Sequence, residues 1–179
     1  FEKKTLNIIS IGRLDEQKQH IILIRALNEL KNKINFKAII IGQGKLKKKL
    51  VNKIMEYKLA KKVRIINFKN NPYNILKKSD LLIHTAKYEG LPNVLLEALV
   101  LKKFIISSNC PTGPREILDS GKGGHLFKVG NFKELSLKII DFTNHKKKLK
   151  KKTFHARKQL KKYDFYKNLN TYLSEIKNI

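Results

Sequence analysis

Two glutamates, Glu89 and Glu97, lie in the segment EGLPNVLLEA at residues 89–98. The glycine after Glu89 lets a ligand approach the backbone closely, and the proline suits the first turn of a helix. The free backbone N–H groups near Asn93 and Val94 would then face an anion, helped by the helix dipole. The segment therefore predicts a helix start that binds an anionic ligand beside an acid.

Glu97 lies about one turn into this helix, whose other residues are almost all apolar. Helix side chains lean toward the N-terminus, so the carboxylate would point back to the same cleft. A carboxylate among apolar side chains is costly unless it has polar partners, and sugar hydroxyls are such partners. The alternative, an ion pair with a surface lysine, is disfavoured because the helix has almost no polar face.

Two cations, Arg13 and Lys18, follow a strand-like run that ends at Gly12. A diphosphate carries roughly two negative charges, and two cations with backbone N–H groups would stabilise it as a leaving group. The alternative is that these residues are simply two more surface cations. The Gly-x-Gly at residues 42–44 lacks the third glycine of a dinucleotide-binding fingerprint and is more typical of a turn.

Metal and disulfide chemistry find little support in the sequence. Cys110 is the single cysteine, so it has no partner for an internal disulfide, and no Cys/His spacing is typical of a zinc site. No Asp-x-Asp pair occurs, which is a common way to hold Mg²⁺ against a diphosphate. The sequence predicts no metal site and no cofactor.

Short apolar runs alternate with helical patterns along the chain. This alternation predicts a parallel sheet covered on both faces, an α/β doubly wound, Rossmann-like domain with ligands at the carboxyl ends of its strands. The expected strands are 6–11, 36–41, 63–68, 80–84, 104–107 and 124–129, and the expected helices are 21–30, 46–57, one after Pro72, 94–101, one from Pro114, and 131 to the end.

The 179 residues are 41% apolar, which is enough for a core and argues against disorder. The net charge is +26, concentrated at residues 44–69 and 145–163, and it raises the alternative of a polyanion- or nucleic-acid-binding module. Because the excess is mostly lysine and lacks stacking or DNA-binding motifs, we expect solvated faces, or else an anionic membrane surface as partner, and no nucleic acid. No apolar run approaches the ~18 residues of a membrane-spanning helix.

Several motifs together resemble one family over roughly residues 6–144. They are SIGRL at 10–14 with Lys18, GQG at 42–44, EGLPNVLLEA at 89–98, CPTGPREIL at 110–118 and GKGGHL at 121–126. Their order is similar to that in the C-terminal, donor-binding half of family-four retaining glycosyltransferases with the GT-B fold. The resemblance implies one nucleotide-sugar-binding domain over 1–179, with 145–179 as C-terminal helices and an acceptor-binding domain outside this chain.

The resemblance also implies roles for individual residues. Arg13 and Lys18 would bind the donor diphosphate and Glu97 the ribose, whereas Glu89 would be the catalytic carboxylate beside the transferred sugar. His84, at the end of a strand, would face the donor sugar or serve the fold. The other implied substrate contacts are Gly12, Phe68, Gly90, Leu91, Asn93 and Val94.

The implied activity is metal-independent, retaining transfer of a hexosyl or N-acetylhexosaminyl group from a UDP-sugar to a glycan or lipid-linked acceptor. The implied setting is bacterial capsule, lipopolysaccharide or glycolipid assembly in the cytoplasm or peripherally at the inner face of the membrane. Because the acceptor site would lie elsewhere, we expect the isolated chain to be inactive. A sugar-nucleotide epimerase of the same fold remains an alternative.

Overall fold

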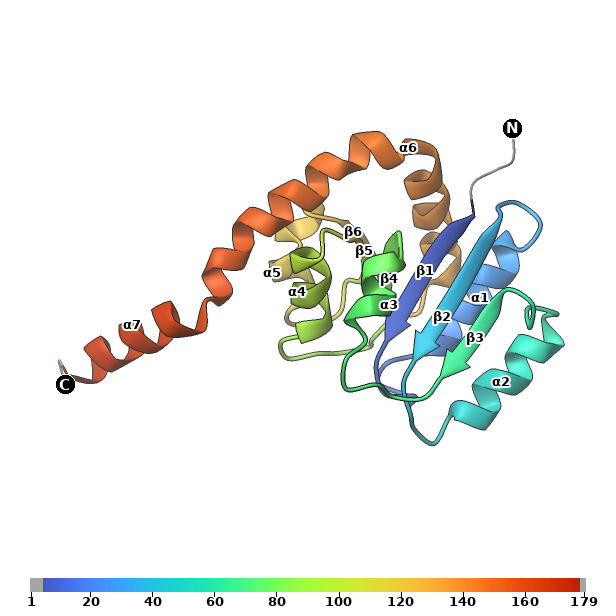
Figure 1. Cartoon of the computed structure of the whole chain (residues 1–179), viewed down its shortest axis with the longest axis horizontal. Coiled ribbons are helices and arrows are strands. Elements are labelled where there is room, and N and C mark those ends of the chain that lie inside the picture. The colour runs from blue at the N-terminus through green and yellow to red at the C-terminus, as the bar shows by residue number, and fades with distance from the viewer. Residues whose placement is uncertain (1–4, 178–179) are drawn as a thin grey trace.

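The computed structural model describes residues 5–177, in which six parallel strands form one sheet of order β3-β2-β1-β4-β5-β6 (Figure 1). This order is that of a doubly wound sheet, and it confirms the Rossmann-like class predicted from the sequence. The strands are β1 (Leu6–Ile11), β2 (Phe36–Ile41), β3 (Val63–Ile66), β4 (Leu81–His84), β5 (Phe104–Ser108) and β6 (His125–Phe127).

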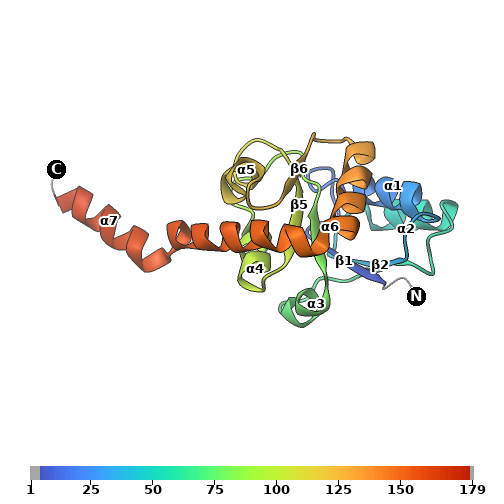
Figure 2. The same ribbon diagram turned by 90° about the horizontal axis from the view of Figure 1, so that it is seen from above.

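Helices cover both faces of the sheet. They are α1 (His20–Leu30), α2 (Lys47–Glu56), α3 (Tyr73–Lys78), α4 (Asn93–Val100), α5 (Pro114–Ile117), α6 (Phe132–Lys158) and α7 (Phe165–Lys177), with 3-10 turns at η1 (Asp119–Gly121) and η2 (Gln159–Tyr163). Residues of α1, α2 and the first part of α6 form one buried cluster with the sheet, and α3, α4 and α5 contribute to a second. Figure 2 shows the two layers from above.

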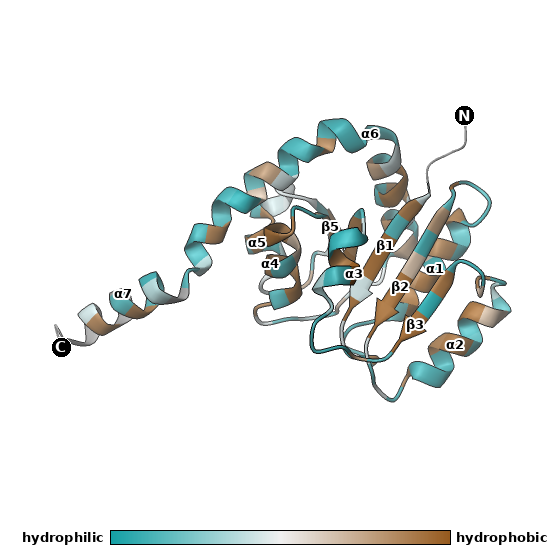
Figure 3. Cartoon of the chain, in the orientation of Figure 1, coloured by the Kyte–Doolittle hydropathy of each residue, from teal (hydrophilic) through white to brown (hydrophobic). Residues whose placement is uncertain are grey.

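Side chains of the strands alternate between the two clusters. Ile8 belongs to the first cluster and Ile9 to the second, and Leu81 and Leu82 divide in the same way. Since successive strand residues point to opposite faces, a strand buried on both sides must be apolar throughout. This explains the mostly apolar strands, much of whose length is brown in Figure 3, whereas Asn7, Lys37 and Arg64 are exposed polar residues of β1, β2 and β3.

The predicted strands at 63–68 and 124–129 are shorter in the structure, ending at Ile66 and Phe127. Both β3 and β6 lie at an edge of the sheet, so each is paired on one side only. The ladder of β3 stops where Ile66 pairs with Ile41, the last residue of β2. A strand without a partner does not continue, and the next residues form a loop instead.

The helical prediction from residue 131 onward is confirmed through residue 177, with interruptions at His145 and at η2, and its last two residues, 178–179, lie outside the described part of the chain. Asn131 caps α6 by accepting a hydrogen bond from the Glu134 backbone N–H at 3.0 Å. The helix kinks at His145, where φ is −118°. Before the kink Ile139 packs in the first core cluster, and after it Ala156 packs in the second. The helix therefore passes from one face of the sheet to the other, and α7 extends away from the domain (Figure 1).

The loops after β1 and β2 touch so closely that a glycine is required at Gly42. A Cβ at this position would overlap the carbonyl oxygen of Gly12. The same loops share backbone hydrogen bonds, from Leu14 N–H to Gln43 O at 2.8 Å and from Leu46 N–H to Leu14 O at 3.0 Å. The Gly-x-Gly at 42–44 is thus explained by loop packing, and a phosphate contact for it stays a prediction.

Replacing Gly42 by alanine should lower the free energy of unfolding by about 1–3 kcal/mol, because the added methyl group must push the two loops apart. Gly90→Ala is the matched control, since a Cβ at Gly90 has no neighbour within 4 Å. Denaturant unfolding of both variants checks this expectation. Equal stability of the two variants would contradict the packing explanation.

His20 opens α1 and is only 3% exposed, with Nδ1 3.2 Å from the Ser10 hydroxyl. Burial disfavours the imidazolium and lowers the pKa of His20 from 6.5 to about 4. The unfolded chain therefore takes up this proton as the pH falls below 6.5, whereas the folded chain resists until about 4. Acid must favour unfolding over this interval.

The free energy of unfolding should fall by about 3 kcal/mol between pH 6.5 and pH 4 on account of His20 alone. His20→Asn keeps a polar side chain beside Ser10 but does not titrate, so its stability should change less over the same interval. Urea unfolding at a series of pH values measures both slopes. Parallel curves for the wild type and the variant would contradict the assignment.

Candidate functional site

A cleft opens at the carboxyl ends of the strands, where the strand order reverses between β1 and β4. It consists of two adjoining hollows of about 340 and 400 Å³, which share Ile11, Gly12, Lys18 and Phe68. The first hollow continues along the start of α4, and the second reaches toward Gly42 and Gln43. Doubly wound sheets bind ligands at this reversal point.

The cleft gathers most of the residues that the sequence analysis singled out. Only His84 and Gly90 among them do not border either hollow. Those that do are Gly12, Arg13, Lys18, Phe68, Glu89, Leu91, Asn93, Val94 and Glu97. Segments that are far apart in the sequence therefore meet at one surface, as the predicted topology requires.

The start of α4 borders the cleft with its first two residues, Asn93 and Val94. Pro92 precedes the helix and makes no side-chain cap for it. The first N–H groups of a helix have no partner within the helix, and they carry the positive end of its dipole. This end of the cleft is therefore suited to an anion.

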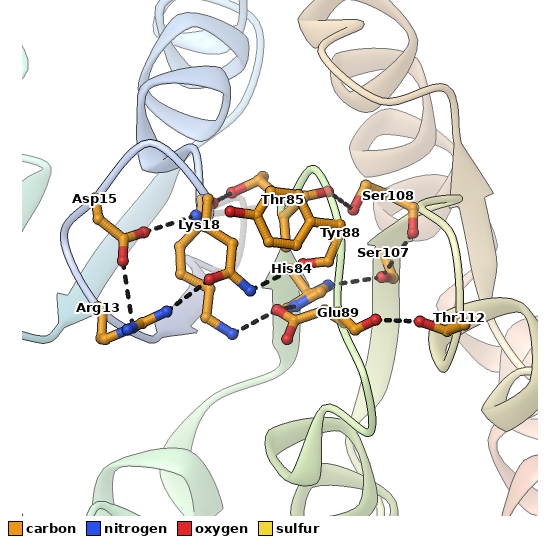
Figure 4. Close-up of polar contacts among 12 residues, drawn as sticks. Arg13, Asp15, Lys18, His84, Thr85, Tyr88, Glu89, Ser107, Ser108 and Thr112 are labelled. Atoms are coloured by element: carbon orange, nitrogen blue, oxygen red, sulfur yellow. Dashed lines mark hydrogen bonds and ion pairs between the residues drawn. The ribbon is translucent and has the colours of Figure 1, made fainter.

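Glu89 is nearly buried, and its Oε1 atom has two partners (Figure 4). His84 Nε2 lies 2.9 Å from Oε1, and Lys18 Nζ forms an ion pair with the same oxygen. The side chains of Glu89 and Lys18 are 7% and 17% exposed. Burial alone would raise the pKa of Glu89, but the hydrogen bonds from His84 and Lys18 outweigh it and hold the pKa below its usual value.

Backbone contacts fix Glu89 from a third side. Its N–H donates to Pro111 O at 3.4 Å, and its carbonyl oxygen accepts a hydrogen bond from the Thr112 hydroxyl. Gly113, with φ of 80°, lets this turn press against Pro92. The CPTGP turn thus supports the loop before α4, a role that its turn-forming residues suggest only in general terms.

The loop that carries Lys18 is held in place by the loop after β4. The Thr85 hydroxyl donates to Lys18 O at 2.7 Å, and Lys87 N–H donates to Gln17 O at 2.8 Å. The Gln17 side chain donates to Tyr88 O at 3.0 Å. These contacts join the loop after β1 to the loop after β4, and they therefore hold the backbone on both sides of the ion pair between Lys18 and Glu89.

Arg13 lies at the rim of the second hollow, with 67% of its side chain exposed. Its Nε is 3.2 Å from an Asp15 carboxylate oxygen, and its Nη2 donates to Gln17 Oε1 at 2.6 Å. The two predicted diphosphate cations thus differ in setting. Arg13 is exposed and can turn, whereas Lys18 is directed at Glu89.

Glu97 borders the cleft as its position on the helix predicted. Burial raises the pKa of its carboxyl group, and a hydrogen bond from the Tyr73 hydroxyl offsets part of this shift. Within residues 5–177 no lysine forms an ion pair with Glu97, so the surface-pair alternative is not supported there. Tyr73 was missed in the sequence, where it follows Pro72 without any motif that links α3 to α4.

A larger hollow of about 470 Å³ lies elsewhere, on the sheet face between α3 and β1, β2 and β3. Its lining combines isoleucines with lysines and contains neither acid of the 89–98 segment nor a helix start. Size alone therefore does not mark the site. In the described part of the chain no three His, Cys, Asp or Glu side chains gather closely enough to hold a metal ion, and no helix between residues 5 and 177 is both long and apolar enough to cross a membrane.

Known proteins with similar sequences carry matching segments. An uncharacterized glycosyltransferase of Methanocaldococcus jannaschii is 43% identical over 117 residues, which is 65% of this chain and 29% of that protein. A Campylobacter jejuni N-acetylgalactosamine-N,N'-diacetylbacillosaminyl-diphospho-undecaprenol 4-alpha-N-acetylgalactosaminyltransferase is 37% identical over 124 residues, 69% of this chain and 33% of that protein. The chain spans about a third of the length of these relatives.

Solved structures show the same fold. Anabaena HepE in complex with UDP superposes with a TM-score of 0.88 at 21% identity, covering 98% of this chain and 49% of that one. The pneumococcal O-GlcNAc transferase GtfA, solved with UDP and GlcNAc, gives 0.84 at 17% identity, covering 98% and 36%. Both likenesses concern the Rossmann-like fold of GT-B glycosyltransferases.

The sequence model of the family described as glycosyl transferases group 1 matches residues 1–159. This range includes every strand of the sheet and every residue that borders the cleft. The chain belongs to the group 1 glycosyltransferases.

Proposed function

We propose that the cleft binds a nucleotide-diphospho-sugar, with UDP as its nucleotide, and that this chain is the donor-binding part of a sugar transferase. The observation that carries the proposal is the meeting of an uncapped helix start, two cations and two acids in one cleft. The UDP complexes of HepE and GtfA favour UDP over other nucleotides. The Campylobacter relative, named for transfer to a diphospho-undecaprenol-linked sugar, favours a lipid-linked or glycan acceptor.

The diphosphate would lie at the start of α4, where Asn93 and Val94 expose N–H groups. Arg13 would turn inward from the rim and exchange Asp15 for phosphate oxygens, since its side chain is largely exposed. Lys18 would move between Glu89 and the diphosphate, because both positions lie along the same hollow. Two positive charges and a helix dipole would then oppose the charge of the diphosphate.

Glu97 would accept hydrogen bonds from the ribose hydroxyls, which supply the polar partners that a half-buried carboxylate needs. Phe68 is 56% exposed and borders both hollows, so its ring and neighbouring main chain would face the base. Leu91 would contact phosphate or sugar at the same edge. The sugar itself would then lie beside Glu89.

During transfer the bond between the anomeric carbon and the diphosphate oxygen would break, an acceptor hydroxyl oxygen would bond to that carbon, and the hydroxyl proton would pass to a phosphate oxygen of the departing UDP. Glu89, kept ionised by His84 and Lys18, would stabilise positive charge at the anomeric carbon. Arg13, Lys18 and the α4 N–H groups would stabilise the departing UDP, so we propose transfer without a metal ion. Retention of the anomeric configuration is proposed from the family resemblance.

We propose that the acceptor binds to a part of the protein outside this chain. Transfer would take place in the cytoplasm or at the inner surface of a bacterial membrane. We therefore expect this chain alone to bind the donor without turnover. A thermal-shift panel of UDP, GDP and ADP tests the nucleotide directly, because a ligand that binds only the folded state raises its melting temperature. Binding that ignores the base and falls steeply with salt would instead favour the polyanion alternative.

The double variant Arg13→Ala with Lys18→Ala should lose at least tenfold in affinity for UDP and much less for uridine, because only UDP carries the diphosphate. Calorimetric titration with both ligands measures the difference. Lys147→Ala with Lys148→Ala removes the same charge from exposed positions on α6 and should leave both affinities nearly unchanged. Equal losses for UDP and uridine would contradict the diphosphate role.

Glu97→Gln should weaken UDP binding about tenfold, since a hydrogen bond to a charged group is worth about 1.5–3 kcal/mol. Pyrophosphate lacks the ribose, so its affinity should not change. Glu56→Gln, at an exposed glutamate of α2, is the matched control. If Glu97→Gln weakens pyrophosphate as much as UDP, the ribose assignment is wrong.

A further inference from the structure

His84 is buried in β4 at 3% exposure, yet it carries polar contacts on both ring nitrogens. Nδ1 lies 2.9 Å from the Ser107 hydroxyl of β5, and Nε2 lies 2.9 Å from Glu89 Oε1. Figure 4 shows the three side chains in a row, with His84 between Ser107 and Glu89. His84 itself borders neither hollow, so the donor-sugar contact considered for it from the sequence would need a rearrangement.

The contact with Glu89 determines which nitrogen of His84 must carry a proton. An ionised carboxylate can only accept hydrogen bonds, so the contact with Glu89 requires a proton on His84 Nε2. At the other end Ser107 has a single hydroxyl proton, which it can give to Nδ1 or to Ser108 O at 3.0 Å. Whichever choice Ser107 makes, Nε2–H donates to Glu89.

Both donors that reach the Glu89 carboxylate use the same oxygen. His84 and Lys18 contact Oε1, and neither contact involves Oε2. Since Glu89 borders the cleft, Oε2 is the oxygen left for a ligand. Hydrogen bonds to Oε1 fix the orientation of the carboxylate, and they therefore also fix the position of Oε2.

The two donors differ in how firmly they are held. Lys18 has a long side chain in a loop, and under the proposed function it turns toward the diphosphate when the donor binds. His84 lies on a central strand, and Ser107 of the neighbouring strand fixes its ring. The contact from His84 is therefore the one that can persist while Lys18 exchanges partners.

We propose that His84, held by Ser107, is a positioning residue that pins Oε1 of Glu89 and so presents Oε2 to the sugar of the bound donor. The inference rests on the proposed function and deepens it, because it separates recognition of the sugar from recognition of the nucleotide. His84 acts through Glu89 and does not touch the substrate. Its loss should therefore affect the UDP-sugar and leave UDP alone.

The test compares dissociation constants for UDP with those for UDP-N-acetylglucosamine and UDP-N-acetylgalactosamine, measured by calorimetry on the full chain. His84→Leu removes the donor at similar volume and should weaken the better-bound sugar nucleotide about tenfold, with UDP changed less than twofold. His84→Gln can place an amide N–H near the position of Nε2 and should restore most of the difference. His125→Gln, at a histidine buried on β6 away from the cleft, should change neither ligand.

A second pair of variants separates positioning from a general effect on folding. In a Glu89→Ala background His84→Leu should have no further effect on sugar-nucleotide affinity, because the side chain it positions is gone. Equal weakening of UDP and the sugar nucleotide, no weakening of either, or an undiminished effect of His84→Leu in that background would each overturn the inference. A wild type that binds neither UDP nor the two sugar nucleotides would instead refute the proposed function.

If His84→Leu does not fold, the wild-type ring can be examined directly. A long-range ¹⁵N–¹H spectrum should show His84 with a proton on Nε2, and the signal should persist when UDP-N-acetylglucosamine is added. A ring protonated only at Nδ1 would overturn the inference.

Discussion

The arrangement of the cleft depends on one buried carboxylate. Glu89 is almost excluded from water, and burying a charge is costly unless it is paired and hydrogen-bonded. Lys18 from the loop after β1 and His84 from β4 meet this requirement together. The need to satisfy Glu89 therefore joins the two central strands of the sheet at the point where the strand order reverses.

The contacts around Glu89 support its pairing with Lys18 and His84. Loops after β1, β2, β4 and β5 are tied to one another by backbone and hydroxyl hydrogen bonds, and the glycines at positions 42 and 113 allow the loops to touch. What remains open is the uncapped start of α4, with Glu97 one turn further in, and the adjoining hollow with Arg13 at its rim. Rigid support on one side and an unsatisfied anion site on the other are what a transferase of a nucleotide-linked sugar would need.

The layers of the fold and the edge of the sheet that carries the site could be predicted, because they depend on local sequence patterns and on the topology of a parallel sheet. Alternating apolar runs determine the layers, and a parallel sheet places the carboxyl ends of its strands together, which brought Arg13, Glu89 and Glu97 to one edge. Which side chains of the site contact one another could not be predicted. Nothing in the sequence says that Lys18 would face Glu89, that His84 would lie behind it, or that Tyr73 would reach Glu97, since such pairs depend on distances between segments that only the fold sets.

A crystal structure of the chain with UDP tests the central claim most directly. The account predicts the diphosphate within hydrogen-bonding distance of the backbone N–H groups at the start of α4, with both cations of the β1 loop turned toward it and the ribose against Glu97. UDP bound on the sheet face beside α3, or with its phosphates far from α4, would contradict the account.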